Sequence, residues 1–126
     1  LDALLRRSDV VSLHCPLSDE NREFMNEDTF KKMKPGALLV NTARGGLIDQ
    51  DALLNALRSG HLGGAALATV DIEPPPRDHA LLTAELPNLL ITPHHAWGSQ
   101  RSRQTLVDQS LENLRAFLNG SPIRCL

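Results

Sequence analysis

The stretch that decides the fold is GALLVNTARGGLID, residues 36–49. It begins with an apolar run at residues 37–41 that has the length and composition of a buried strand. The run leads into Arg44 and the flexible pair Gly45-Gly46, and Asp49 then stands where it can cap a helix over residues 50–58. A strand that turns directly into a helix is a unit of an α/β fold.

Three further apolar runs have strand length, at residues 10–15, 64–70 and 89–92. Helices are expected at residues 1–7, from the cap Asn26 to the stop at 35–36, and from the cap Ser99 to 119–120. The last of these carries an apolar stripe, and three consecutive prolines exclude regular structure from the loop 71–79. Strands that are apolar on both faces and alternate with helices predict a parallel sheet. We therefore expect the C-terminal half of a Rossmann-type doubly wound α/β sheet, followed by a terminal helix.

Composition narrows the class of protein. The 126 residues are 41% hydrophobic and carry a net charge of −2, which is ordinary for one globular domain and offers no basic surface for nucleic acid or anionic membrane. Two cysteines do not form a disulfide framework, and no histidine or cysteine cluster has metal-site spacing, so we expect no metal. A cytoplasmic protein is the default expectation.

Ligands of open parallel sheets bind beyond the carboxyl ends of the strands, and three reactive side chains follow predicted strands there. Arg44 could grip a carboxylate with its planar fork, and Gly45-Gly46 would let a substrate approach closely. Glu73 beside His94 would fix the tautomer of the imidazole and stabilise its charged form, which suits a general acid–base.

Each of these side chains also has an ordinary interpretation. Arg44 could be a surface arginine in a turn, Glu73 a solvated loop acid, and His94 a histidine satisfied by backbone. Taken together, the three suit reduction of a 2-keto acid, in which the histidine protonates the carbonyl oxygen as a hydride arrives from a nicotinamide. We interpret three further histidines, His14, His61 and His79, as structural.

Three segments carry a family resemblance: residues 13–17 (LHCPL), 36–49 and 92–97 (TPHHAW). They resemble the D-isomer-specific 2-hydroxyacid dehydrogenases, and the likeness extends over nearly the whole chain. The separation of Arg44 and Glu73 is also similar to that of the family. Trp97 makes the chain similar to the glycerate dehydrogenase (hydroxypyruvate reductase) branch and to the C-terminal binding protein corepressors. The resemblance leaves open a dinucleotide-sensing binding protein that is not an enzyme, or a module that serves only in assembly.

The resemblance implies roles for individual residues. Arg44 would bind the substrate carboxylate, His94 would be the proton donor, and Glu73 its acidic partner. The implied cofactor is NAD or NADP, bound with help from Arg44, His94 and the residues Cys15, Pro16, Asn21, Thr42, Ala43, Ala96 and Trp97.

Two departures from the family pattern stand out. Ala68 occupies the position five residues before Glu73, where the family usually has an aspartate that holds the nicotinamide carboxamide. Asp71 lies three residues after Ala68, so its side chain need not point in the same direction. The Gly-x-Gly-x-x-Gly phosphate loop is also absent, so we expect the chain to be the C-terminal part of a longer protein that places this loop upstream of Leu1.

The expected organisation follows from the same resemblance. Residues 1–98 would complete the NAD(P)-binding domain, and residues 99–126 would form a helix and tail that cross toward the substrate domain. The whole protein would be a homodimer that acts on a small 2-keto or 2-hydroxy acid. By itself, the chain is expected to be inactive.

Overall fold

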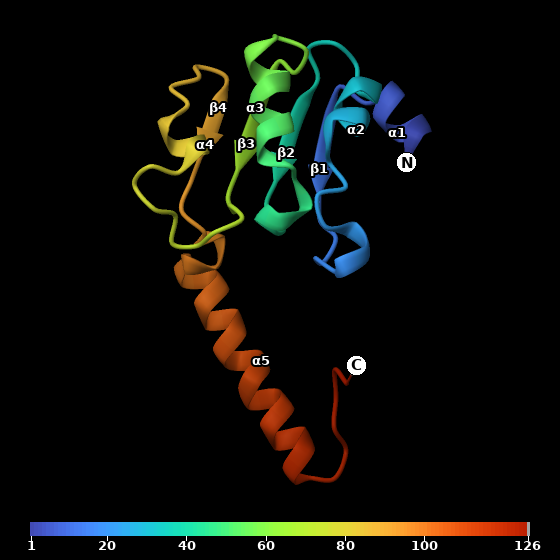
Figure 1. Cartoon of the computed structure of the whole chain (residues 1–126). Helices are drawn as coiled ribbons and strands as arrows, with labels where there is room; N and C mark the ends of the chain where they lie inside the picture. The colour runs from blue at the N-terminus through green and yellow to red at the C-terminus, as the bar shows by residue number, and fades with distance from the viewer. Residues whose placement is uncertain (126) are drawn as a thin grey trace. The chain divides into compact units, whose positions relative to one another are not determined.

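The computed structural model describes residues 1–125, which form two compact units that divide between His94 and His95. The first unit is built on four strands, β1 (Val10–Leu13), β2 (Leu38–Asn41), β3 (Gly64–Leu67) and β4 (Leu89–Ile91). They pair in parallel in the order β1-β2-β3-β4 (Figure 1). The predicted parallel α/β sheet is therefore confirmed.

Two of the four helices of the first unit, α2 and α3, begin at the caps that the sequence predicts. They are α1 (Asp2–Arg7), α2 (Glu27–Lys32), α3 (Gln50–Arg58) and the short α4 (Ala80–Thr83). The Asn26 side chain accepts hydrogen bonds from the backbone of Asp28 and Thr29 at the start of α2, and Asp49 accepts one from Ala52 in α3. Both predicted caps are confirmed, whereas α4 and the 3₁₀ turns η1 (Asp19–Asn21) and η2 (Gly45–Leu47) were not predicted.

In the described residues of the first unit, helices cover one face of the sheet. Each strand lies next to the strand that precedes it in the sequence. Right-handed crossovers between such neighbours place every connecting helix on the same face of the sheet. Figure 1 shows α2 and α3 along that side. On the other face, within the described part of the chain, Val10, Leu38 and Leu90 are 53%, 45% and 61% exposed.

The covered face holds the core. Leu39 of β2 and Leu53 of α3 are fully buried there, together with Phe30 of α2. Each such side chain contributes about 1.5–3 kcal/mol through burial. This packing fixes where β2 and β3 end, and their carboxyl ends carry the candidate site.

Strand β3 ends at Leu67, three residues before the predicted end at Val70. The backbone N–H of Ala68 still donates to the carbonyl of Asn41, 2.9 Å away, and continues the ladder with β2. The N–H of Val70 instead donates to the Glu73 carboxylate. The chain therefore leaves the sheet because a side chain replaces the neighbouring strand as hydrogen-bond acceptor.

The second unit consists of η3 (Ala96–Gly98) and the long helix α5 (Gln100–Leu118). Ser99 caps α5 by accepting a hydrogen bond from the backbone of Ser102, as predicted. The side chains of the predicted apolar stripe are 48–73% exposed; they are Val107, Leu111, Leu114 and Leu118. Among residues 1–125, no helix is long and apolar enough to cross a membrane.

Candidate active site

The site is organised by a close contact between two loops. Gly45, just after β2, packs directly on the peptide that joins Val70 to Asp71, just after β3. A Cβ atom at Gly45 would lie 1.9 Å from the carbonyl carbon of Val70 and 2.3 Å from the amide nitrogen of Asp71. Only glycine allows this approach. It brings the Arg44 turn against the loop that carries Glu73.

Asn41 shapes the Arg44 turn from inside. Its side chain is fully buried at the end of β2. The Asn41 amide donates to the carbonyl oxygen of Arg44 at 2.8 Å, and its side-chain oxygen accepts from the backbone N–H of Ala43 at 2.9 Å. Asn41 was not among the residues that the sequence predicted for the site. A buried amide at a strand end, next to a turn, was the signal available, since Asn commonly bonds the backbone of turns.

Glu73 uses its two carboxylate oxygens for different purposes. Oε1 accepts the backbone N–H of Val70 at 3.1 Å, which anchors the side chain to the end of β3. Oε2 lies 2.7 Å from Nδ1 of His94, which follows β4. The His94 hydrogen bond lowers the pKa of Glu73, against a smaller opposing effect of burial, and the backbone of Val70 and the charges of His94 and Arg44 lower it further. Glu73 is therefore an anion at neutral pH.

This arrangement sets the tautomer of His94. A carboxylate only accepts hydrogen bonds, so Nδ1 carries a proton and Nε2 is the ring atom available to a reacting group. The His94 side chain is 42% exposed and that of Glu73 35% exposed, so a ligand can reach the pair.

Arg44 belongs to the same edge. Its side chain is exposed, and its charge lies close enough to Glu73 to lower the pKa of that carboxyl. One guanidinium nitrogen, Nη1, donates a hydrogen bond to the carbonyl oxygen of Ala43 at 2.7 Å. The structure thus brings Arg44, Glu73 and His94 together, from the ends of three neighbouring strands.

A cavity of about 480 Å³ adjoins the His94–Glu73 pair. Its other lining residues are mostly apolar and include Ala68, Thr69, Ile91 and Pro93. Thr69 is 4% exposed, and its hydroxyl has no hydrogen-bond partner among residues 1–125. A buried hydroxyl without a partner is costly, which makes Thr69 an unusual residue in this wall.

The predicted cofactor residues are distributed over both units. Cys15 is half-buried after β1, Thr42 is exposed and Ala43 half-buried beside Arg44. Asn21 holds its own loop: its side chain accepts from the backbone of Ser18 and donates to the carbonyl of Pro16, both at 2.8 Å. Ala96 and Trp97 lie in η3 of the second unit, where Trp97 is 60% exposed.

Asp71 does not stand in for an aspartate at position 68. Its Oδ1 lies 2.8 Å from Nε2 of His79, which is buried. Asp71 lines a different cavity, together with Asp49 and Gln50 at the start of α3, whereas Ala68 lines the cavity beside His94. The side chain of Asp71 is thus committed elsewhere.

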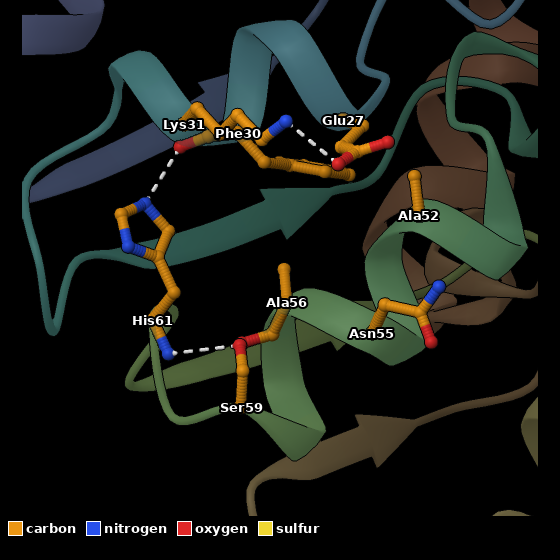
Figure 2. Close-up of a pocket in the computed structure, with 8 residues that line it drawn as sticks. All are labelled: Glu27, Phe30, Lys31, Ala52, Asn55, Ala56, Ser59 and His61. Carbon is orange, nitrogen blue, oxygen red and sulfur yellow. Dashed lines mark hydrogen bonds and ion pairs between the residues drawn. The ribbon is translucent and has the colours of Figure 1, made fainter.

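A third groove lies between α2 and α3 and is separate from the Arg44 edge. Figure 2 shows His61 reaching across it to the backbone of Phe30, where its Nε2 lies 2.8 Å from the carbonyl oxygen. Lys31 and Glu27 pair on the opposite wall at 2.7 Å. The ring of His61 therefore ties the end of α3 to α2.

A parallel sheet of Rossmann type, with an arginine and a histidine–carboxylate pair at its carboxyl edge, defines the class as a dinucleotide-dependent dehydrogenase domain. Residues 1–96 match the family model described as D-isomer specific 2-hydroxyacid dehydrogenase, NAD binding domain. The chain belongs to this family.

Known relatives agree with this family. The chain is 47% identical to a glycerate dehydrogenase of Methylorubrum extorquens over 97% of its own length and 39% of that protein. Among solved structures it resembles a D-lactate dehydrogenase of Lactobacillus jensenii with NAD⁺ (TM-score 0.87, 31% identity, 99% of this chain and 41% of that one). It also resembles a D-isomer specific 2-hydroxyacid dehydrogenase of Xanthobacter autotrophicus with NADPH and MES (TM-score 0.84, 36% identity, 98% of this chain and 50% of that one). The chain spans about two fifths of the length of the curated relatives it matches.

The Gly45 contact predicts a large loss of stability for Gly45→Ala. The new Cβ would overlap backbone atoms of Val70 and Asp71, which cannot move without shifting the end of β3. We expect a loss of about 3 kcal/mol or more in the free energy of unfolding, measured by urea denaturation. Gly46→Ala is the matched control, because its Cβ would meet only the ends of flexible side chains, Leu17 at 2.9 Å and Arg22 at 3.4 Å. Equal stability of the two variants would contradict the contact.

The lone hydroxyl predicts that Thr69→Val stabilises the protein. Valine has nearly the same shape and removes a buried polar group that has no partner among the described residues. We expect a gain of about 1 kcal/mol in the free energy of unfolding. Thr42→Val, at an exposed position, should change it by less than about 0.5 kcal/mol. A loss of stability in Thr69→Val would show that the hydroxyl has a partner in the folded protein.

Proposed function

We propose that the protein carrying this chain is an NAD(P)-dependent oxidoreductase that interconverts a small 2-keto acid and its D-2-hydroxy acid, with hydroxypyruvate and glycerate as the model pair. The observation that carries the proposal is the 2.7 Å contact of His94 with Glu73, at the same sheet edge as Arg44. The relatives named glycerate dehydrogenase and hydroxypyruvate reductase support this choice of substrate class.

Each of the three side chains has one task in this proposal. Arg44 binds the substrate carboxylate through its guanidinium, which can give two parallel hydrogen bonds. His94 holds a proton at Nε2 and gives it to the carbonyl oxygen during reduction, then takes it back in the reverse direction. Glu73 remains ionised, keeps Nδ1 protonated and stabilises the charged ring.

The residues present fit the nicotinamide end of a dinucleotide in part. When bound, NADH or NADPH supplies the hydride. The proton donor and the arginine suit a keto acid held next to it. Ala68, however, offers no hydrogen bond to a carboxamide, and Asp71 is engaged by His79. The proposal assigns further contacts with the cofactor to seven residues, carried over from the family resemblance; they are Cys15, Pro16, Asn21, Thr42, Ala43, Ala96 and Trp97.

The proposal extends to the state of the whole protein. From the family resemblance we propose a homodimer located in the cytoplasm. The division of the chain into residues 1–98, for cofactor binding, and 99–126, leading to the substrate domain, is part of the same proposal.

The role of Arg44 is tested by Arg44→Lys in the intact protein. A lysine ammonium is a point charge and cannot replace the planar fork. We expect kcat/KM for hydroxypyruvate with NADH to fall about 10²-fold, equivalent to about 2.7 kcal/mol. Arg58→Lys, on the exposed side of α3, is the matched control and should leave kcat/KM unchanged. Wild-type kinetics in Arg44→Lys would refute the assignment, and dinucleotide binding without turnover in the wild type would favour a sensing protein.

The role of Glu73 is tested by the pH dependence of the same reaction. Glutamine keeps a hydrogen-bond acceptor but loses the negative charge that stabilises a protonated His94. In Glu73→Gln, the alkaline limb of the kcat/KM profile for keto-acid reduction should therefore move to lower pH. The low pKa of Glu73 means that its charge is present in the wild type across the neutral range and is lost only under acidic conditions. An unmoved alkaline limb would show that Glu73 does not tune the proton donor.

A further inference from the structure

The loop that carries Glu73 is closed by a second histidine–carboxylate pair. Asp71 stands at the start of the loop and His79 at its end, eight residues apart, and Asp71 Oδ1 lies 2.8 Å from His79 Nε2. The His79 side chain is 5% exposed and that of Asp71 39% exposed. The ring of His79 is therefore far less accessible than that of His94, whereas the carboxylates of Asp71 and Glu73 are about equally exposed.

The ring of His79 is fully used by hydrogen bonds within the protein. Its Nδ1 accepts the backbone N–H of Leu81, which caps the start of α4, at 3.3 Å. Since Nδ1 is an acceptor, Nε2 carries the proton and donates to Asp71. The His79 side chain thus leaves no ring nitrogen for a ligand.

The pair links the Glu73 loop to the core. Leu81 of α4 is buried at 3% exposure, and the carbonyl of His79 accepts the backbone N–H groups of Leu82 and Thr83. Burial disfavours the charge of Asp71, but the hydrogen bonds from His79 and Gln50 outweigh it and hold its pKa below the ordinary value. Asp71 is therefore a charged acceptor, which strengthens its bond to the imidazole.

Asp71 is joined through Val70 to the backbone that anchors Glu73. Its N–H belongs to the Val70–Asp71 peptide on which Gly45 packs, and the N–H of Val70 binds the carboxylate of Glu73. A shift of Asp71 would consequently move the backbone anchor of Glu73 and its 2.7 Å contact with His94. Displacements of about 1 Å at such positions can reduce turnover about 10²-fold.

We propose that the Asp71–His79 pair is a positioning device for the proton donor: it closes the 71–79 loop so that Glu73 stays bonded to His94. Asp71 and His79 act through Glu73 and touch neither substrate nor cofactor. The consequence for turnover rests on the proposed function, whereas the consequence for Glu73 does not.

The test compares three variants of the intact protein. Asp71→Ala removes the acceptor of His79, Asp71→Asn keeps an oxygen acceptor for Nε2, and Asp78→Ala removes an exposed carboxylate of the same loop as a control. The first readout is the pKa of the Glu73 carboxyl, followed by ¹³C NMR. It should rise toward the ordinary value in Asp71→Ala, because the contact with His94 weakens, and stay low in Asp71→Asn and Asp78→Ala.

The second readout is keto-acid reduction across pH with hydroxypyruvate and NADH. In Asp71→Ala we expect kcat to fall about tenfold or more, and the alkaline limb of the pH profile to move to lower pH. Asp71→Asn should keep kcat and the position of that limb close to their wild-type values. An unchanged Glu73 pKa in a folded Asp71→Ala would overturn the proposal. If that pKa rises while the wild-type protein does not reduce any 2-keto acid, the positioning role stands and the proposed function fails. If Asp71→Ala does not fold, the variant His79→Gln replaces it, because the glutamine amide has both an acceptor and a donor. The proposal would be refuted if His79→Gln loses the contact with Asp71 and the pKa of Glu73 nevertheless stays low.

Discussion

The candidate site depends on one close approach, that of Gly45 to the Val70–Asp71 peptide. The loops after β2 and β3 would otherwise be separate surface turns. Because no side chain intervenes, Arg44 on one loop comes within electrostatic reach of Glu73 on the other. Val70, whose carbonyl belongs to that peptide, anchors Glu73 through its own N–H, so one residue connects both halves of the site. Parallel pairing of β3 with β4 then brings His94 to the free oxygen of that carboxylate.

Two histidine–carboxylate pairs of similar geometry lie at this edge and differ mainly in their surroundings. The distance from the ring nitrogen to the carboxylate oxygen is 2.7 Å in the His94–Glu73 pair and 2.8 Å in the His79–Asp71 pair. His94 is partly exposed and keeps one ring nitrogen free, which suits proton transfer. His79 is buried with both nitrogens bonded, which suits a structural link. Accessibility and the use of the second nitrogen thus separate a chemical role from a supporting one.

Much of the fold could be predicted because it depends on local patterns. The four apolar runs, the caps Asn26, Asp49 and Ser99, and the parallel order follow from strand length, capping chemistry and alternation. The ends of the strands could not be predicted so well: β3 was expected to reach Val70, but the N–H of Val70 binds the carboxylate of Glu73, three residues further along the chain. Asn41 was missed for a related reason: its importance comes from burial beside the Arg44 turn, which composition does not reveal.

The sequence by itself determined the α/β class, the family resemblance and the candidates Arg44, Glu73 and His94, because strand periodicity and motif residues are properties of short segments. Only the tertiary structure decided that Asp71 is occupied by His79, that Gly45 packs on the Val70–Asp71 peptide, and that one face of the sheet is open in the described residues. These facts depend on the order of the strands and on how the loops pack, as in the contact of Asp71 with His79 and that of Gly45 with Val70. Contacts of that kind follow from how the whole core packs, so no local pattern in the chain specifies them.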